Sequence, residues 1–567
     1  MRRTGPCLLI CCPPWASPTF SPGCSPKGSR VGFIKMTQPL PCFLWTDRAP
    51  SLHMSLPTLE AYLRALQQPA SRTFRDYALQ RCDIERNTLG MPRVRSGNFA
   101  LVFRMNDVSA KRSYALRVFT RVSKDVEERY QAIAEAIKAI RESQGSSFFV
   151  DFDYQAHGMV VNDQTVPVIK MDWNYGETLG EYLYKNYKDS KRIAKLRAQL
   201  RELCAFLQKM AIAHGDIQLG NILVSKDGAQ IKLIDYDGMY VPELKGRLAS
   251  ELGQVNFQHP GRKESLFGPE LDRFAFMSLD LSLGLLEHNA ELWDRTYSDE
   301  EGVIFRATDY ANPLASQTFG LAAQVPALSL PTKQFALMCL GPVEKLPDPF
   351  EFFESRIPPG TLVFKPRPKP EGEAVKKEVQ PERVYVGSFE VVAAGQFAKV
   401  IRHAGRRVEA VGKVLDVRSG KAYFGSSRLP RPYIYVDFTA MSGGNVVRIK
   451  LLPEILESFT GERRLLPNDS WIGKWVTVSE VIQPIQYLSH PSFPLGIGEA
   501  GIVVNDPFQV KIISAEEAAF RLKGNNHLVR RRLGTRMTTR EVPAGSRISG
   551  SPGQRRNTDA LIRLSKM

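Results

Sequence analysis

Four side chains in the middle of the sequence are of types that can take part in phosphoryl transfer. The segment HGDIQLGNILV contains His214, Asp216 and Asn221, and Asn221 follows Asp216 by five residues. Nineteen residues after Asp216, the segment IKLIDYDGMY contains Asp235. In phosphoryl transfer an aspartate accepts the proton of the acceptor hydroxyl, while amide and carboxylate oxygens hold a metal ion against the phosphates. These four residues are therefore the first candidates for a functional site.

The two segments are more informative together than apart. Asp, Asn and Gly are frequent at turns, so HGD or DYD alone is consistent with ordinary loop residues. Here both occur in order, and each borders an apolar run that predicts a strand, ILV after Asn221 and IKLI before Asp235. The interval between Asp216 and Asp235 has room for a strand, a turn and a second strand.

Strands, one helix, further strands and then helices are predicted ahead of these loops. PRVRSGNFALVFRM and SYALRVFTRV alternate apolar and polar residues, which predicts adjacent strands or a hairpin. KDVEERYQAIAEAIKAIRE repeats apolar residues every three to four positions, as an amphipathic helix does. Strands are expected around FFVDFDYQ, GMVVND and VPVIKMDW, and helices over TLGEYLYKNY and from about 191 to 213. Residues 56–92 begin with a predicted leader helix that Pro69 stops.

With this order of elements, residues 93–355 resemble the protein-kinase-like superfamily. HGD combined with DYD is similar to its bacterial serine/threonine-kinase-like branch and to the aminoglycoside-kinase relatives. The resemblance implies an α+β fold with two lobes. It also implies an ATP- and Mg²⁺-dependent phosphotransferase, above all a serine/threonine protein kinase acting on a protein substrate. A shared fold does not by itself imply activity.

The resemblance assigns a role to each residue of these loops. Asp216 would be the catalytic base, and Asn221 and Asp235 would be the magnesium ligands. His214 would belong to the catalytic loop and brace it. In FGPELDRFAF, Asp272 would hold the backbone of that loop.

Further positions are assigned to the nucleotide phosphates by the same resemblance. Gly97 and Phe99, in RSGNFALVF, would belong to the loop that covers the phosphates. In SYALRVF, Arg117 stands where the family has a phosphate-contacting lysine. A guanidinium binds phosphate with two hydrogen bonds, but it is broader than an ammonium. The helix glutamate expected to pair with Arg117 is Glu128, with Glu135 as the second choice.

The segment VPVIKMDWNYGETL resembles the connection between the two lobes, whose backbone contacts the adenine. Met171 would be the gatekeeping residue at its start. Asp172 and Asn174 would follow it along the nucleotide.

Three residues depart from the family pattern near the candidate site. Gly215 replaces an arginine that in many kinases senses a phosphorylated activation loop, so control by that route is not expected. Gln218 replaces a lysine that steadies the transferred phosphate. Asp237 replaces a glycine, and the sequence leaves open whether it is a second metal ligand or a turn residue.

The sequence after residue 355 predicts a linker and a second, all-β part. Residues 356–383 are rich in Pro, Lys and Glu and lack apolar spacing, as linkers do. Between 384 and 515, five strand-like segments with the helix PEILESF between the third and fourth match the order of an OB-fold, a small barrel. Such barrels bind single-stranded nucleic acid by aromatic stacking and basic residues, so nucleic acid and a protein are the two expected partners. The candidate residues are Tyr433, Tyr435, Phe438, Lys413, Arg418, Arg448 and Lys450.

Charge and cysteine usage restrict the setting. The net charge of +17 favours polyanionic partners without naming one. Much of the excess lies in 516–567, which is expected to be a basic disordered tail. The cysteines show neither a disulfide framework nor metal-ligand spacing, and no apolar run approaches the ~20 residues of a membrane span. A cytoplasmic protein with no membrane partner is expected, and residues 1–55 are expected to be disordered or a start-site extension.

Three functional hypotheses follow. The first is an active kinase, because Asp216, Asn221 and Asp235 are all present. The second is a nucleotide-binding pseudokinase scaffold, because Arg117 and Gln218 depart from the residues that position phosphate. The third is a nucleic-acid-binding protein whose kinase-like half is regulatory.

Overall fold

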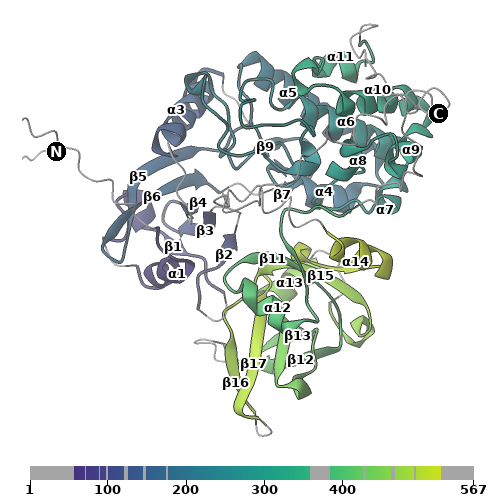
Figure 1. Cartoon of the computed structure of the whole chain (residues 1–567). Coiled ribbons are helices and arrows are strands. Elements are labelled where there is room, and N and C mark those ends of the chain that lie inside the picture. The colour runs from purple at the N-terminus through teal and green to yellow at the C-terminus, as the bar shows by residue number, and fades with distance from the viewer. Residues whose placement is uncertain are drawn as a thin grey trace, which may run out of the picture. The chain divides into compact units, whose positions relative to one another are not determined.

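The computed structural model has an α+β fold, as predicted, with several separate sheets and a group of helices in the middle of the chain (Figure 1). The residues that it describes belong to one compact unit. They are 56–69, 72–87, 90–96, 100–119, 126–144, 148–173, 176–357, 384–424, 429–461, 466–490 and 493–524. The predicted extension at 1–55, nearly all of the predicted linker and the tail beyond residue 524 lie outside these ranges. Within them, no helix combines the length and apolar character needed to cross a bilayer.

The first part of the chain forms an antiparallel sheet of six strands. The strands are β1 (Asp83–Ile84), β2 (Val94–Ser96), β3 (Ala100–Asp107), β4 (Arg112–Phe119), β5 (Phe152–Val161) and β6 (Gln164–Asp172). Their order is β1-β3-β4-β6-β5, with β2 on β3. The predicted hairpin is β3–β4, in which Val102 pairs with Arg117. This register places Arg117 in the middle of the sheet.

Three helices accompany this sheet, and the shortest of them is α2 (Tyr77–Gln80). The predicted leader helix is α1 (Leu59–Gln67), and the Tyr62 hydroxyl donates to the carbonyl of Phe119 at 2.9 Å. The predicted amphipathic helix is α3 (Val126–Gln144). Its apolar stripe is buried at Tyr130, Ile133 and Ile137, as the three-to-four spacing predicts.

Residues 176–357 are mainly helical. A small sheet of β7 (Glu177–Thr178), β8 (Ile222–Val224) and β9 (Ile231–Leu233) lies among these helices. The helices are α4 (Leu179–Asn186), α5 (Ser190–Lys209), α6 (Arg273–His288), α7 (Leu292–Arg295), α8 (Ala307–Ala311), α9 (Gln317–Ala323), α10 (Ser329–Leu340) and α11 (Pro349–Phe353). Every residue of α6 from 274 to 286 is buried, because the helix is surrounded by its neighbours. The buried Asp280 of α6 pairs with Arg197 and Arg201 of α5 at 2.8 and 2.6 Å.

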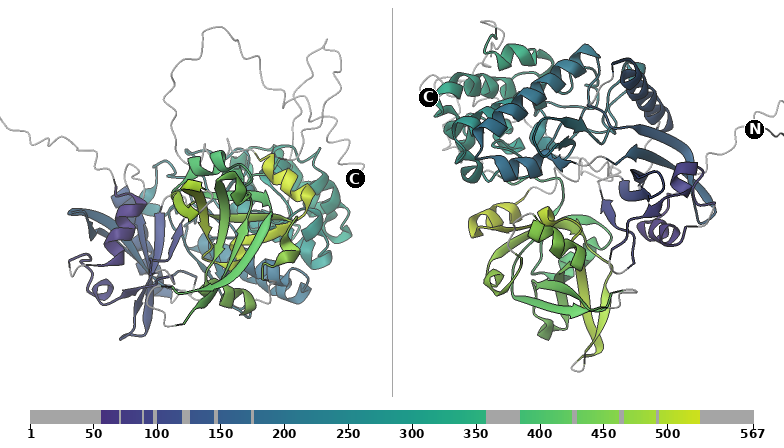
Figure 2. Two further views of the ribbon diagram at one scale, coloured as in Figure 1. Left: turned by 90° about the horizontal axis from the view of Figure 1, so that it is seen from below. Right: turned by 180° about the vertical axis from the view of Figure 1, so that it is seen from behind.

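Residues 384–524, called the C-terminal β part below, contain two sheets that share a core. One has the order β10-β11-β15-β18 and the other β12-β13-β14-β17-β16. The strands are β10 (Val391–Ala393), β11 (Arg407–Lys413), β12 (Asp416–Ala422), β13 (Arg431–Asp437), β14 (Asn445–Leu451), β15 (Trp475–Val481), β16 (Gln486–His490), β17 (Phe493–Val503) and β18 (Val510–Ile513). Side chains from both sheets meet in one cluster that includes Val408, Val436 and Ile502. The strands gather in one body, green to yellow in Figure 2.

The predicted OB barrel is not confirmed. The five predicted strands are β11, β13, β14, β15 and β18, and the predicted helix is α13 (Pro453–Gly461). Four further strands were missed, and neither sheet closes among the described residues. Strand β17 was not predicted, because Gly496, Gly498 and Gly501 interrupt the alternation of apolar residues that indicates a strand.

The predicted tail begins too early. Helix α14 (Ala515–Leu522) follows β18, and the Ser514 side chain caps it by accepting from the Glu517 amide. Its residue Arg521 is buried. This short amphipathic helix was not predicted, because the sequence after it is strongly basic and the whole of 516–567 was assigned to the tail.

Candidate functional site

Two loops of the helical part bring the first candidates together. One loop joins α5 to β8 and carries His214, Asp216 and Asn221, and the other follows β9 and carries Asp235. The Asn221 amide donates to the backbone carbonyl and to the carboxylate of Asp216, both at 3.0 Å. The buried His214 ring lies 3.0 Å from the carbonyl of Ile234, the residue before Asp235. The His214 contact therefore ties the second loop to the first.

Asp272 holds the first loop, as expected from the sequence. It lies immediately before α6, and its two carboxylate oxygens accept the backbone amides of His214 at 2.5 Å and of Gly215 at 2.8 Å. The residue is 5% exposed, and burial raises the pKa of its carboxyl. Two amide donors compensate the buried acceptor and fix the backbone just before Asp216.

Gly215 is present for a steric reason. Its φ is +78°, in the left-handed region that favours glycine. A Cβ at this position would lie 2.1 Å from the carbonyl oxygen of Gly238. An arginine here would force apart the loops that carry Asp216 and Asp235, so the glycine permits their close approach.

Arg117 reaches the second loop from strand β4. Its guanidinium donates to Asp235 at 2.8 Å and also to Asp237. The Tyr130 hydroxyl of α3 donates to the other oxygen of Asp237 at 2.7 Å. Asp237 is thus an ion-pair partner of Arg117. The sequence analysis considered only two roles for Asp237, a second metal ligand or a turn residue.

The predicted pairing of Arg117 with Glu128 is wrong. Glu128 is exposed and pairs with Arg247 instead, while Glu135 is exposed and accepts from Gln131. Glu128 precedes the buried Tyr130 by two residues, which is about 200° around an α-helix. The carboxylate that compensates Arg117 therefore comes from the loop after β9.

Negative charge dominates the surroundings of these loops. Burial raises the pKa of Asp237 to about 6, although Arg117 acts to lower it. Burial and the carboxylates of Asp216, Asp237 and Asp235 raise the pKa of Glu251 well above its usual range. Glu251 could not be identified from the sequence, because it lies in an irregular segment without a recognisable motif. A cation bound beside these carboxylates would favour their charged forms.

The raised pKa of Asp237 has a consequence for stability. Between its unfolded value of 3.8 and about 6, the folded chain keeps a proton on Asp237 that the unfolded chain has released. The contribution of this group to the free energy of unfolding therefore falls as the pH rises through that window. We expect the free energy of unfolding of the wild type, relative to Asp237→Asn, to fall between pH 4.5 and 7 in denaturant titrations. An unchanged difference would contradict the raised pKa.

Asp235 has the backbone and exposure of a ligand-facing residue. Its φ is +65°, which is unusual for a residue other than glycine and costs energy. The side chain of Asp235 is 43% exposed, whereas the side chain of Arg117 is 9% exposed. No three His, Cys, Asp or Glu side chains of the described ranges are arranged as metal ligands. Asp235 and Asn221 nevertheless supply the oxygen atoms that Mg²⁺ prefers, and this ion usually needs only one or two carboxylates beside phosphates.

The remaining nucleotide-site candidates are placed only in part. Met171 is buried on β6, where it pairs with Ala115 of β4. Asp172, at the end of β6, pairs with Arg112 at 2.8 Å. Gly97, Phe99 and Asn174 lie outside the described residues.

The basic residues predicted to meet nucleic acid are mostly paired with carboxylates. Arg448 is buried and pairs with Asp437 at 2.7 Å and Glu499 at 2.8 Å. Arg418 also pairs with Asp437, and Lys450 pairs with Glu499. Phe438 is buried, while Lys413 is exposed. A nucleic-acid partner is not supported at these positions, because three of the four candidate cations are already paired with carboxylates.

Comparison with known proteins gives a partial similarity. No family model matches this chain. Over 178 residues the chain is 24% identical to "Protein kinase kin1" of Schizosaccharomyces pombe. The match covers 29% of this chain and 20% of that protein, so the chain spans about one fifth of the relative's length. The chain is thus similar to a protein kinase over part of its length.

Proposed function

We propose that this chain is an ATP- and Mg²⁺-dependent phosphotransferase of the protein-kinase-like superfamily, with a protein serine or threonine as acceptor. The observation that carries the proposal is the arrangement of Asp216 and Asn221 on a loop fixed by Asp272, opposite the Arg117–Asp235 pair. In this proposal the sheet with α3 and the helical part are the two lobes of a kinase fold.

Each residue has a defined task in the proposed reaction. Asp216 accepts the proton of the attacking hydroxyl, because the resemblance assigns the general base to this position and a carboxylate can take up that proton. Asn221 and Asp235 would hold a magnesium ion, which would neutralise charge on the nucleotide phosphates when bound. Arg117 lies beside Asp235 and presents its guanidinium to the phosphates. His214 and Asp272 hold the loop and touch no substrate.

Incubation with Mg²⁺ and ATP followed by mass spectrometry of the protein tests the proposal. Autophosphorylation is read out without knowledge of the substrate. Added phosphate that depends on both Mg²⁺ and ATP would support the phosphotransferase. A melting shift with Mg²⁺ and ATP but no transfer to itself or to any acceptor would favour the nucleotide-binding scaffold, in which Arg117 stays paired with Asp235 and Asp237.

Asp235→Asn tests the metal site. We expect the variant to lose the Mg²⁺-dependent part of the thermal stabilisation by ATP, because an amide cannot neutralise the ion as a carboxylate does. The fold should persist, since the Asp235 side chain is 43% exposed. Differential scanning fluorimetry with and without Mg²⁺ measures this. A full shift in the variant would refute the assignment of Asp235 as a metal ligand.

A further inference from the structure

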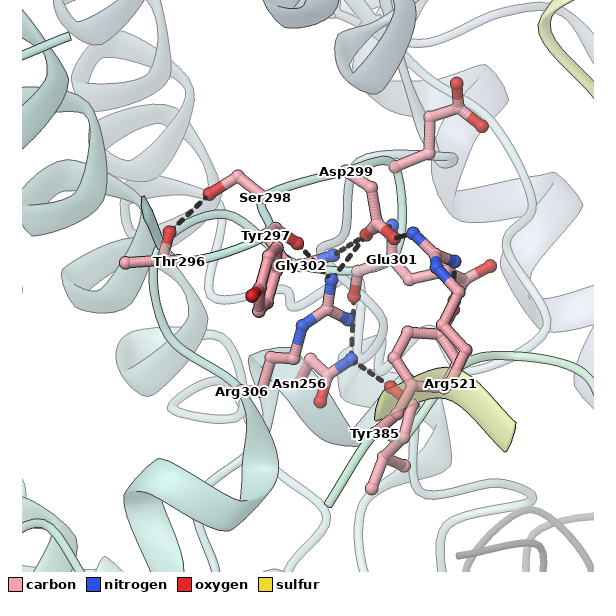
Figure 3. A network of polar contacts seen from close by, with 12 residues as sticks. Asn256, Thr296, Tyr297, Ser298, Asp299, Glu301, Gly302, Arg306, Tyr385 and Arg521 are labelled. Atoms are coloured by element: carbon pink, nitrogen blue, oxygen red, sulfur yellow. Dashed lines mark hydrogen bonds and ion pairs between the residues drawn. The ribbon is translucent and has the colours of Figure 1, made fainter. Parts of the chain in front are cut away.

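A buried polar network joins the C-terminal β part to the helical part (Figure 3). Arg521 of α14 donates to Asp299, to Glu409 of β11 at 2.6 Å and to the Tyr385 hydroxyl at 2.9 Å. Arg306 donates to the other oxygen of Asp299 at 2.7 Å. Both guanidinium groups lie over the Tyr385 ring. The Cζ atoms of Arg306 and Arg521 are 5.0 Å and 4.8 Å from the ring centroid. Asp299 thus connects Arg306 of the helical part with Arg521 of the C-terminal β part, and this contact between the two parts is called the junction below.

The charges of this network are removed from water. The side chains of Arg306, Arg521 and Asp299 are 1%, 4% and 6% exposed. Burial acts to raise the pKa of Asp299, but Arg306 and Arg521 together hold it below its usual range. Removal of one partner from such a group leaves an uncompensated buried charge, so the contact is costly to break. The junction therefore holds the C-terminal β part against residues 299–308.

Glu301 extends the network toward the catalytic loop. One of its carboxylate oxygens accepts the backbone amide of Ser388 at 2.6 Å and the side-chain amide of Gln254 at 3.0 Å. The backbone carbonyl of Glu301 accepts from Gln254 at 3.1 Å and from Asn256 at 2.8 Å. Asn256 also donates to the carbonyl of Val386 at 2.7 Å. Segment 254–256 is thus held by Glu301 and by the start of the C-terminal β part.

Gln254 in turn contacts Asp216. Its backbone amide donates to the carboxylate oxygen of Asp216 that Asn221 and Gln218 do not occupy. The approach is close because residue 253 is a glycine with φ of +69°, where a Cβ would lie 2.8 Å from that carboxylate oxygen. A continuous series of hydrogen bonds therefore leads from Ser388, through Glu301 and Gln254, to the proposed catalytic base.

We infer that Glu301 and Gln254 are positioning residues for Asp216, and that docking of the C-terminal β part through Arg521 and Asp299 holds them in place. The inference rests on the proposed function for its catalytic consequence. A general base works only when its carboxylate points at the proton that it accepts. Loss of the Gln254 amide, which holds the orientation of Asp216, should therefore slow the reaction. The C-terminal β part then supports the loop that carries Asp216, and it is not an independent binding module.

Two variants of the full chain test this inference, each with a matched control. Glu301→Ala removes the carboxylate that accepts from Ser388 and Gln254, and leaves only the backbone carbonyl of residue 301 for Gln254. Arg521→Met removes the cation that joins Asp299 to the C-terminal β part. Glu291→Ala and Arg295→Met are the same substitutions at exposed positions of the neighbouring α7 segment. Glu301→Gln keeps an oxygen acceptor and is the conservative rescue.

Backbone hydrogen exchange of residues 252–258 is the first readout, and it requires no phosphotransfer. We expect Glu301→Ala and Arg521→Met to speed exchange there about tenfold or more, and Glu301→Gln and both controls to resemble the wild type. Unchanged exchange of 252–258 in Glu301→Ala would overturn the inference. If Arg521→Met fails to fold, the comparison of Glu301→Ala with Glu301→Gln still decides the question.

The rate of ATP turnover is the second readout. We expect Glu301→Ala to lower kcat about tenfold with little change in KM for ATP, because Gln254 contacts the proposed base. Faster exchange with unchanged kcat would overturn the positioning role. A wild type without any turnover would refute the proposed function, while the exchange results would still report whether the junction holds segment 252–258.

Discussion

Asp216→Asn should reduce phosphate transfer by about 10²- to 10⁴-fold, the range that general acid–base catalysis contributes. Asn is similar in size to Asp but cannot accept the proton of the attacking hydroxyl. The native carboxylate accepts hydrogen bonds from Gln218, Asn221 and the Gln254 amide. Transfer from radiolabelled ATP, measured beside the wild type, gives the ratio directly.

Stability must be measured with the same variant. The amide that Asp216→Asn introduces would turn its NH₂ group toward one of these donors, which costs about 1–3 kcal/mol through a lost hydrogen bond. Asp83→Asn, at an exposed position of β1, is the matched control for the substitution itself. A folded Asp216→Asn variant with wild-type transfer would exclude Asp216 as the base.

The sequence predicted those features that depend on local spacing. The β3–β4 hairpin and the buried stripe of α3 follow from alternation and from three-to-four periodicity, which neighbouring residues determine. The Asp272 contact with the His214 loop spans 58 residues, and it was expected from the family resemblance and not from local spacing. Features that depend on distant pairing were less accessible. The second sheet of the C-terminal β part pairs β14 with β17 across an intervening helix and two strands.

The candidate site shows the same division between local and distant information. His214, Asp216, Asn221 and Asp235 were predicted and lie together, because short loops carry them. The partner of Arg117 was predicted on the wrong element, since its choice depends on how α3 packs beside the loop after β9. The apolar stripe of α3 already indicated that Glu128 faces away from Tyr130. Glu301 is 85 residues from Asp216, and only the folded chain connects them through Gln254.

Arg117 is expected to have the second-largest effect. Arg117→Met should reduce phosphate transfer by about 10²-fold or more, the scale of losing one preorganised charge-stabilising contact. The native guanidinium is nine-tenths buried and uses two nitrogens, one toward Asp235 and one toward Asp237. Arg117→Lys keeps the charge but has a single nitrogen, so it should retain part of the activity and bridge the two carboxylates less well. Phosphate transfer and KM for ATP are the measurements.

A double variant separates catalysis from folding. Arg117→Met alone leaves the buried Asp237 without its cation, which should destabilise the fold by about 3–5 kcal/mol if the carboxylate stays charged. Arg117→Met with Asp237→Asn removes both charges, so we expect it to recover much of that stability in denaturant titrations. It should nevertheless remain as inactive as Arg117→Met, because no cation then faces the nucleotide phosphates. Recovery of transfer together with stability would show that Arg117 only holds the loop, and that the phosphates are contacted by another group.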